Sequence, residues 1–283
     1  MLIHIVRSIA VAAALVAATF YPFLPGPYDR AAHTISITAQ VLTIGSLLLV
    51  PVGLLWLVRA WRSRTTSASD GQARAGRRRL ETLTAIVTML VAGLAGVGAV
   101  SSGTAALGAA IIVLGGVTGW RMRRRLERSS PAAVATHLIV VPLAALGLTA
   151  VMSGWAMTSS RLRAMAHAAQ VLADIEQHHA REGSHPVSLV ALNHDYETGV
   201  VGIERYAYVR HGRAFSLSFQ QPELLFPNVG TREVVVYNPA GEHLHASHAA
   251  WFAVRPYESL IAQQGWYAGF DAELPNWRYL WFD

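Results

Sequence analysis

Three histidines near the C-terminal end of the chain have a spacing that can bind a metal ion. In His243-x-His245-x-x-His248, the first two side chains fall on the same face of an extended strand, within reach of one ion. Imidazole nitrogen is a ligand for both zinc and copper. We therefore consider a Zn or Cu site at these three residues. The alternative is a solvated histidine cluster without a function, because the spacing matches no strict metal motif.

A second group of possible metal ligands surrounds the expected end of a long helix. It consists of His178, His179, Glu182 and His185. These residues offer imidazole nitrogen and carboxylate oxygen as ligands, and the alternative of a solvated cluster applies to them as well.

The other polar residues give no sign of catalysis. The chain has no cysteine, which excludes thiol chemistry and disulfide bonds. No serine lies in a nucleophile-elbow motif, and no dinucleotide fingerprint, phosphate loop or paired-carboxylate pattern occurs. Glu204 and Glu233 are expected to be solvated strand residues. We predict a non-enzymatic protein without catalytic or cofactor-binding residues.

Aromatic residues crowd the end of the chain, with ten of them in the last 33 positions. One interpretation is the core of a small sheet. The other is a surface for a protein partner or for the membrane interface, since Trp and Tyr favour both. The candidate interaction residues are Trp266, Tyr267, Trp277, Tyr279 and Trp281.

Most of the N-terminal half is apolar. The chain is 53% hydrophobic and only 14% charged, whereas a soluble protein has about 25% charged residues. A membrane-spanning helix needs about 20 apolar residues. We predict a bundle of five transmembrane helices within residues 1–155, and an α+β domain over residues 156–283. The predicted spans are 8–24, 37–58, 82–100, 104–120 and 132–155.

The first span begins with a basic residue and small side chains, as a signal peptide does. It lacks a clean small-x-small cleavage site, so we expect it to be retained.

The arginines are distributed unevenly. Residues 1–153 carry 14 Arg and 4 acidic residues, whereas residues 154–283 carry 9 Arg and 13 acidic residues. The N-terminal arginines gather in segments 59–79 and 121–128. Short loops rich in Arg stay in the cytoplasm. The pattern predicts a bacterial inner-membrane protein with a cytoplasmic N-terminus and a periplasmic or extracellular C-terminal domain. It is compatible with contacts to anionic lipids and does not indicate nucleic-acid binding.

The predicted spans have no charged residue in their cores, which argues against a proton relay or an ion pathway. His137 is expected to be a hydrogen-bonded structural residue, and Gln40 to bond between helices. Small residues four positions apart, such as Ala92/Gly96, favour close packing of spans three and four. The alternative is a homo-oligomer formed through the same face.

Beyond residue 155 the pattern changes to that of an α+β domain. A helix is expected near 158–182, with Gly183 as its C-terminal cap. A helical turn over 185–192 follows, and then a hairpin of 203–210 and 213–220. A third strand is expected at 232–238, with which 243–247 and 250–255 are expected to pair. The tail is expected to form a short helix and a last strand over 277–282.

The end of this helix and the hairpin carry a recognisable pattern. It reads Ala168-x-x-x-Leu172-x-x-Ile175-Glu176, then Glu182-Gly183-x-x-Pro186-x-Ser188-Leu189-x-x-Leu192, then Tyr206-Ala207-Tyr208. Over residues 164–238 the chain resembles the head domains of type IV pilins and type II secretion pseudopilins. The resemblance implies a membrane helix that continues into an amphipathic helix packed on an antiparallel sheet. It implies a fold and no functional residue.

These features favour a membrane protein whose C-terminal domain binds an envelope protein within a secretion-type assembly. Two other classes remain open. One is a metal- or ligand-sensing protein that uses His243, His245 and His248, and the other is a small-solute transporter.

Overall fold

The computed structural model describes residues 2–65, 70–101, 104–192, 196–211, 214–225, 232–239, 244–246, 250–253 and 269–282. The chain divides into two compact units. The helical unit comprises Met1–Phe20 and Thr34–Met152, and the α+β unit comprises Tyr21–His33 and Ser153–Asp283. Segment 21–33, which was expected to belong with the spans, therefore groups with the C-terminal residues.

The α-helices are α1 (Leu2–Phe20), α2 (Arg30–Ser46), α3 (Leu49–Thr65), α4 (Asp70–Ser101), α5 (Ala105–Leu126) and α6 (Pro131–Glu182). Among the described residues, α1, α4, α5 and α6 are each long and apolar enough to cross a membrane. Helices α2 and α3 add a fifth candidate if together they form one bent span.

The expected second span is a broken helix. Helices α2 and α3 meet at an angle of 42°. Pro51 explains the break, because proline has no N–H to donate to the carbonyl of Leu47 and its ring clashes with that carbonyl. The Leu47 oxygen instead accepts a hydrogen bond of 3.1 Å from the backbone N–H of Val50, one residue earlier than in an α-helix. The apolar stretch 37–58, which was expected as one span, therefore consists of two helices that meet at a bend.

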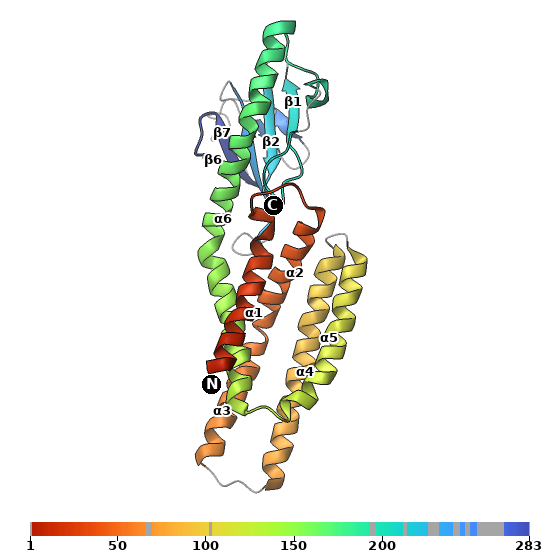
Figure 1. The fold of residues 1–283 in the computed structure, drawn as a ribbon, viewed down its shortest axis with the longest axis vertical. Coiled ribbons are helices and arrows are strands. Elements are labelled where there is room, and N and C mark those ends of the chain that lie inside the picture. The colour runs from red at the N-terminus through yellow and green to blue at the C-terminus, as the bar shows by residue number, and fades with distance from the viewer. Residues whose placement is uncertain are drawn as a thin grey trace. The chain divides into compact units, whose positions relative to one another are not determined.

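Helices α4 and α5 form a tightly packed hairpin and lie side by side in Figure 1. A Cβ atom added at Gly108 would lie 2.5 Å from the carbonyl oxygen of Gly96, and one added at Gly96 would lie 2.9 Å from that of Gly108. One added at Gly115 would overlap the Cβ of Ala92. These contacts confirm the prediction that small residues pack spans three and four together.

Helix α6 is a single helix of 52 residues that contributes to both units. It ends as expected at Glu182, just before Gly183, which has a φ of 71°. The N–H of Gly183 donates to the carbonyl of His179 over 2.9 Å, in the manner of a C-terminal cap. A 3₁₀ turn, η2 (Leu189–Leu192), follows within the segment that was expected to form a helical turn.

The α+β unit contains a five-stranded antiparallel sheet with the strand order β1-β2-β3-β7-β6. Its strands are β1 (Ala207–His211), β2 (Ala214–Gln220), β3 (Arg232–Tyr237), β6 (Gly269–Asp271) and β7 (Trp277–Phe282). The expected hairpin, third strand and last strand are confirmed, although β1 begins at Ala207 and not at Ile203.

Two short strands lie apart from this sheet. Strands β4 (Leu244–Ala246) and β5 (Ala250–Ala253) pair only with each other among the described residues. The expectation that they extend the third strand is wrong, because β3 pairs along its free side with β7. The short helix expected in the tail falls outside the described residues.

The core of the α+β unit lies between α6 and one face of the sheet. Residues three or four positions apart on α6 contact alternate residues of β2, because side chains share one face every 3.6 residues in a helix and every two residues in a strand. The core includes Ala164, Met165, Ala168, Val171, Ile175, Phe215, Leu217, Phe219, Val235 and Trp277. This arrangement agrees with the amphipathic helix predicted from the sequence.

Candidate functional site

The α+β unit contains a buried charge cluster at Arg161 of α6. The Arg161 side chain, only 6% exposed, donates from Nη1 to Glu233 Oε1 over 2.6 Å. Its Nε and Nη2 atoms donate to the two carboxylate oxygens of Glu273 over 3.0 and 2.8 Å. The guanidinium also lies 4.0 Å above the ring of Tyr279. One arginine thus joins α6 to β3, to β7 and to the loop between β6 and β7.

A neutral hydrogen-bond network continues the cluster. Gln221 accepts a bond of 2.8 Å from Ser160 Oγ and donates one of 3.2 Å to the carbonyl of Met157. Its backbone N–H donates to the carbonyl of Glu233 over 2.9 Å. Gln221 therefore fastens α6 to the end of β2 immediately beside the ion pair.

Burial dominates the electrostatics of Glu233. Loss of water raises the pKa of this carboxyl, and the charge of Arg161 opposes the rise. The hydrogen bonds from Arg161 lower the pKa of Glu273, which is more exposed. The second carboxylate oxygen of Glu233 has no hydrogen-bond partner among the described residues. The arrangement places one arginine between two carboxylates and attaches α6 to the sheet.

Glu233 corrects a prediction from the sequence, which placed it in solvent. It is 3% exposed. The sequence carried a signal that could have found its partner, since Arg161 lies three and four positions before Ala164 and Met165 on the apolar stripe of α6. A charge on a buried stripe requires an opposite charge. The sequence does not show which acid supplies it.

The histidines at the end of α6 form a packed pair rather than a metal site. The rings of His179 and His185 lie 4.2 Å apart, and His185 packs edge-on against Phe215 at 5.0 Å. No three His, Asp or Glu side chains among the described residues are placed to hold a metal ion. The metal site considered at His178, His179, Glu182 and His185 is therefore wrong, because apolar packing of His185 draws it into the core.

The first histidine group is only partly described. His243 and His248 lie outside the described residues, and His245 is placed only as a member of β4. A Zn or Cu site at these three residues stays a prediction.

The five candidate interaction residues have different surroundings. Trp266 and Tyr267 lie outside the described residues. Trp277 is buried in the core, and Tyr279 stacks on Phe270 with ring centroids 5.1 Å apart while it supports Arg161. Trp281 is half-buried. The core-packing interpretation fits Trp277, and a partner surface at the others stays a prediction.

Segment 22–29, here called the clasp, is held by residues 199–202 within the α+β unit. Val201 donates to the carbonyl of Leu24 over 3.0 Å and accepts from the N–H of Asp29 over 2.9 Å. Gly202 donates to the carbonyl of Pro22 over 2.8 Å. The connection between the first two predicted spans is therefore a structural part of this unit.

The segment after α6, residues 183–192 and here called the exit turn, presents two apolar side chains to solvent. Val187 is 77% exposed and Val190 is 85% exposed. The backbone beneath them is fixed, since Tyr208 Oη donates to the carbonyl of Pro186 over 2.9 Å. Arg210 donates to the carbonyl of His185 over 3.1 Å.

The resemblance of residues 164–238 to pilin head domains stays a prediction from the sequence pattern. No protein-family model, no curated protein and no solved structure matches this chain.

Proposed function

We propose that this chain is an integral protein of a bacterial inner membrane that carries a protein-interaction domain outside the cytoplasm. The apolar helices support the first part of this proposal. The arginines support the orientation, because those of segments 59–79 and 121–128 flank the ends of the apolar helices on one side of the predicted membrane.

The observation that carries the interaction function is the exit turn. Val187 and Val190 are the most exposed large apolar residues described in the α+β unit. Leu189 and Leu192 of the same turn pack against the core, and the bonds from Tyr208 and Arg210 fix its start. A fixed turn loses little conformational entropy when a partner covers it. Two exposed valines on an ordered turn offer a protein partner an apolar contact at a small cost in conformational entropy.

The charge cluster supports a non-enzymatic role. Arg161 and Glu233 are buried away from water, and the guanidinium of Arg161 donates hydrogen bonds to the carboxylates of Glu233 and Glu273. The cluster attaches α6 to the sheet and so holds the exit turn at the end of a stable helix. We propose that the whole unit displays this turn to another envelope protein, within a secretion-type or other envelope assembly.

Site-specific photo-crosslinking from the exit turn tests this function. A crosslinker at position 187 or 190, in the full chain in native membranes, is expected to capture one defined protein. Val187→Asp should abolish crosslinking from position 190, and Val190→Asp should abolish crosslinking from position 187. The reason is that a charge buried in an apolar contact is costly. Ser188→Asp is the matched control, since it adds the same charge to an exposed residue of the same turn.

The result that would contradict the proposal is specific to the valines. Capture that survives both Asp variants, or that Ser188→Asp reduces equally, would show that the valines do not form the contact. Recovery of no defined partner from either position in native membranes would argue against the function itself.

A further inference from the structure

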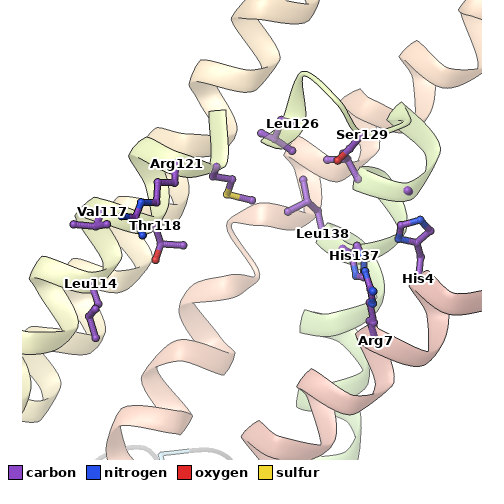
Figure 2. Close-up of a pocket in the computed structure, with 13 residues that line it drawn as sticks. His4, Arg7, Leu114, Val117, Thr118, Arg121, Leu126, Ser129, His137 and Leu138 are labelled. Carbon is purple, nitrogen blue, oxygen red and sulfur yellow. The ribbon is translucent and has the colours of Figure 1, made fainter. Parts of the chain in front are cut away.

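The helical unit has a cavity with cationic and apolar walls. It has a volume of about 510 Å³ and lies between the first turns of α1, the last turns of α5 and the start of α6. Figure 2 shows His4 and Arg7 on α1, Arg121 on α5 and His137 on α6 around it. The volume is within the range of small-molecule sites, roughly 300–1,000 Å³.

The cavity has an excess of positive charge. Arg7 and Arg121 both line it, and neither forms an ion pair with any described residue. No Asp or Glu is among the described residues that line it. By contrast, Arg77 at the same end of the unit is paired with Glu81 over 2.8 Å. Two arginines that line one cavity and find no counter-charge in the described part of the chain indicate an anionic ligand.

One wall of the cavity is fixed by a hydrogen bond between helices. Ser8 Oγ on α1 lies 2.6 Å from His137 Nδ1 on α6 and donates to the carbonyl of His4 over 2.9 Å. Because a hydroxyl has one hydrogen, this pattern assigns the hydrogen on Nδ1 to His137 and makes Ser8 its acceptor. The bond confirms that His137 is a hydrogen-bonded structural residue, and it holds α1 against α6 beside Arg7.

The cavity combines its charge with exposed apolar surface. Val117 and Leu114 lie on the same side of α5 as Arg121, one and two turns earlier respectively, and both are exposed. Arg7 and Arg121 lie at the ends of the apolar stretches of α1 and α5. In the membrane placement proposed above, on which this inference rests, the arginines are at the depth of the cytoplasmic headgroups and the two apolar residues face the acyl chains.

We propose that this cavity binds one anionic phospholipid of the cytoplasmic leaflet. Its phosphate lies between Arg7 and Arg121, and its acyl chains lie along Leu114 and Val117. Phosphate accepts hydrogen bonds from both guanidinium groups, whereas a neutral zwitterionic lipid brings a cation that the two arginines repel. The lipid joins α5 to α1 at an end of the unit where these two helices are separated by the cavity.

The test measures lipid binding to the purified full chain in a neutral detergent. Phosphatidylglycerol is expected to raise the thermal unfolding temperature and to appear as one bound lipid in native mass spectra, and phosphatidylcholine is not. Each arginine near an anionic lipid contributes about fivefold in affinity. The double variant Arg7→Gln, Arg121→Gln should therefore bind phosphatidylglycerol roughly 30-fold more weakly.

Arg128→Gln is the matched control, because Arg128 is exposed near the same end of α5 and does not line the cavity. It should bind phosphatidylglycerol as the unchanged protein does. Equal weakening by Arg128→Gln would overturn the site, as would equal binding of phosphatidylcholine. A rise in the thermal unfolding temperature with inorganic phosphate that equals the rise with phosphatidylglycerol at the same concentration is the third such outcome. That result would contradict a lipid ligand and indicate a site for free phosphate.

Discussion

Arg161 Nη1 lies 2.6 Å from Glu233 Oε1, and both side chains are almost completely buried although the residues are 72 positions apart. The pair connects the helix that leaves the apolar region to the third strand of the sheet. A buried ion pair of this kind contributes little net free energy compared with apolar residues, but removal of one partner is costly. The attachment of α6 to the sheet therefore depends on both charges.

Arg161→Ala is expected to destabilise the α+β unit by about 3–5 kcal/mol, because it leaves Glu233 buried without a counter-charge. The loss is measured by denaturant unfolding of the full chain in detergent, with hydrogen exchange at β3 as the local readout. Arg163→Ala is the control, since Arg163 is exposed on the same helix. Equal losses in the two variants would contradict the buried pair.

The stability of the α+β unit should fall in weak acid because of His185. Burial, helped by His179 and Arg210 and opposed by Glu176, lowers the pKa of His185 below its ordinary value of 6.5. As the pH falls through 6.5, the unfolded chain takes up the proton before the folded unit does. The contribution of neutral His185 to the free energy of unfolding is complete above pH 6.5. It declines as the pH falls, until the pH is below the pKa of His185 in the folded state.

The slope of this decline is at most about 1.4 kcal/mol per pH unit. His185→Phe keeps the contact with Phe215 and should flatten the unfolding free energy between pH 7 and 5. His178→Gln is the control, because His178 is only half-buried and its neighbour His179 supplies the ring contact to His185. A pH dependence that persists in His185→Phe would assign the effect to another group.

Substitutions at two glycines of α5 should have opposite effects. Gly108→Ala places a methyl group 2.5 Å from the carbonyl oxygen of Gly96, so α4 and α5 must separate and the thermal unfolding temperature in detergent should fall. Gly116→Ala meets no atom of the described residues within 4 Å and should be neutral or stabilising by up to about 1 kcal/mol. A fall at Gly116 equal to that at Gly108 would contradict the hairpin packing.

The clasp should detach when Gly202 becomes larger. A Cβ atom at Gly202 would lie 2.7 Å from the carbonyl oxygen of Pro22, which accepts the Gly202 hydrogen bond. Gly202→Val should therefore speed hydrogen exchange at the N–H groups of Gly26 and Asp29, which donate to residues 199 and 201. Gly154→Val, where a Cβ has open space, should leave their exchange unchanged. Unchanged exchange in both variants would contradict the clasp.

The proposed orientation is tested with fusions. Alkaline phosphatase at the C-terminus should be active, because the enzyme folds only outside the cytoplasm, and a fusion within residues 62–79 should be inactive. A green fluorescent protein at the same two positions should give the reverse pattern. Activity at 62–79 with an inactive C-terminal fusion would contradict the topology.

Local patterns in the sequence predicted most elements of the α+β unit. Helix α6 ends at Glu182, before Gly183, as the glycine cap requires. The last strand, Trp277–Phe282, has the predicted bounds, and the register of the β1–β2 hairpin follows from a short turn. Strand partners were harder to predict, because pairing depends on contacts between distant segments. This is why β3 pairs with β7 and not with β4 or β5.

The sequence by itself determined the number and length of the apolar stretches, the uneven distribution of arginine and the small residues that pack α4 against α5. These follow from composition and periodicity, which are properties of short windows. Only the tertiary structure decided that Glu233 is buried against Arg161, that His185 packs on Phe215, and that two arginines without an ion-pair partner among the described residues share one cavity. Burial and charge pairing depend on side chains that folding brings together from distant positions, so a local pattern can indicate a buried charge such as Arg161 but cannot identify its partner.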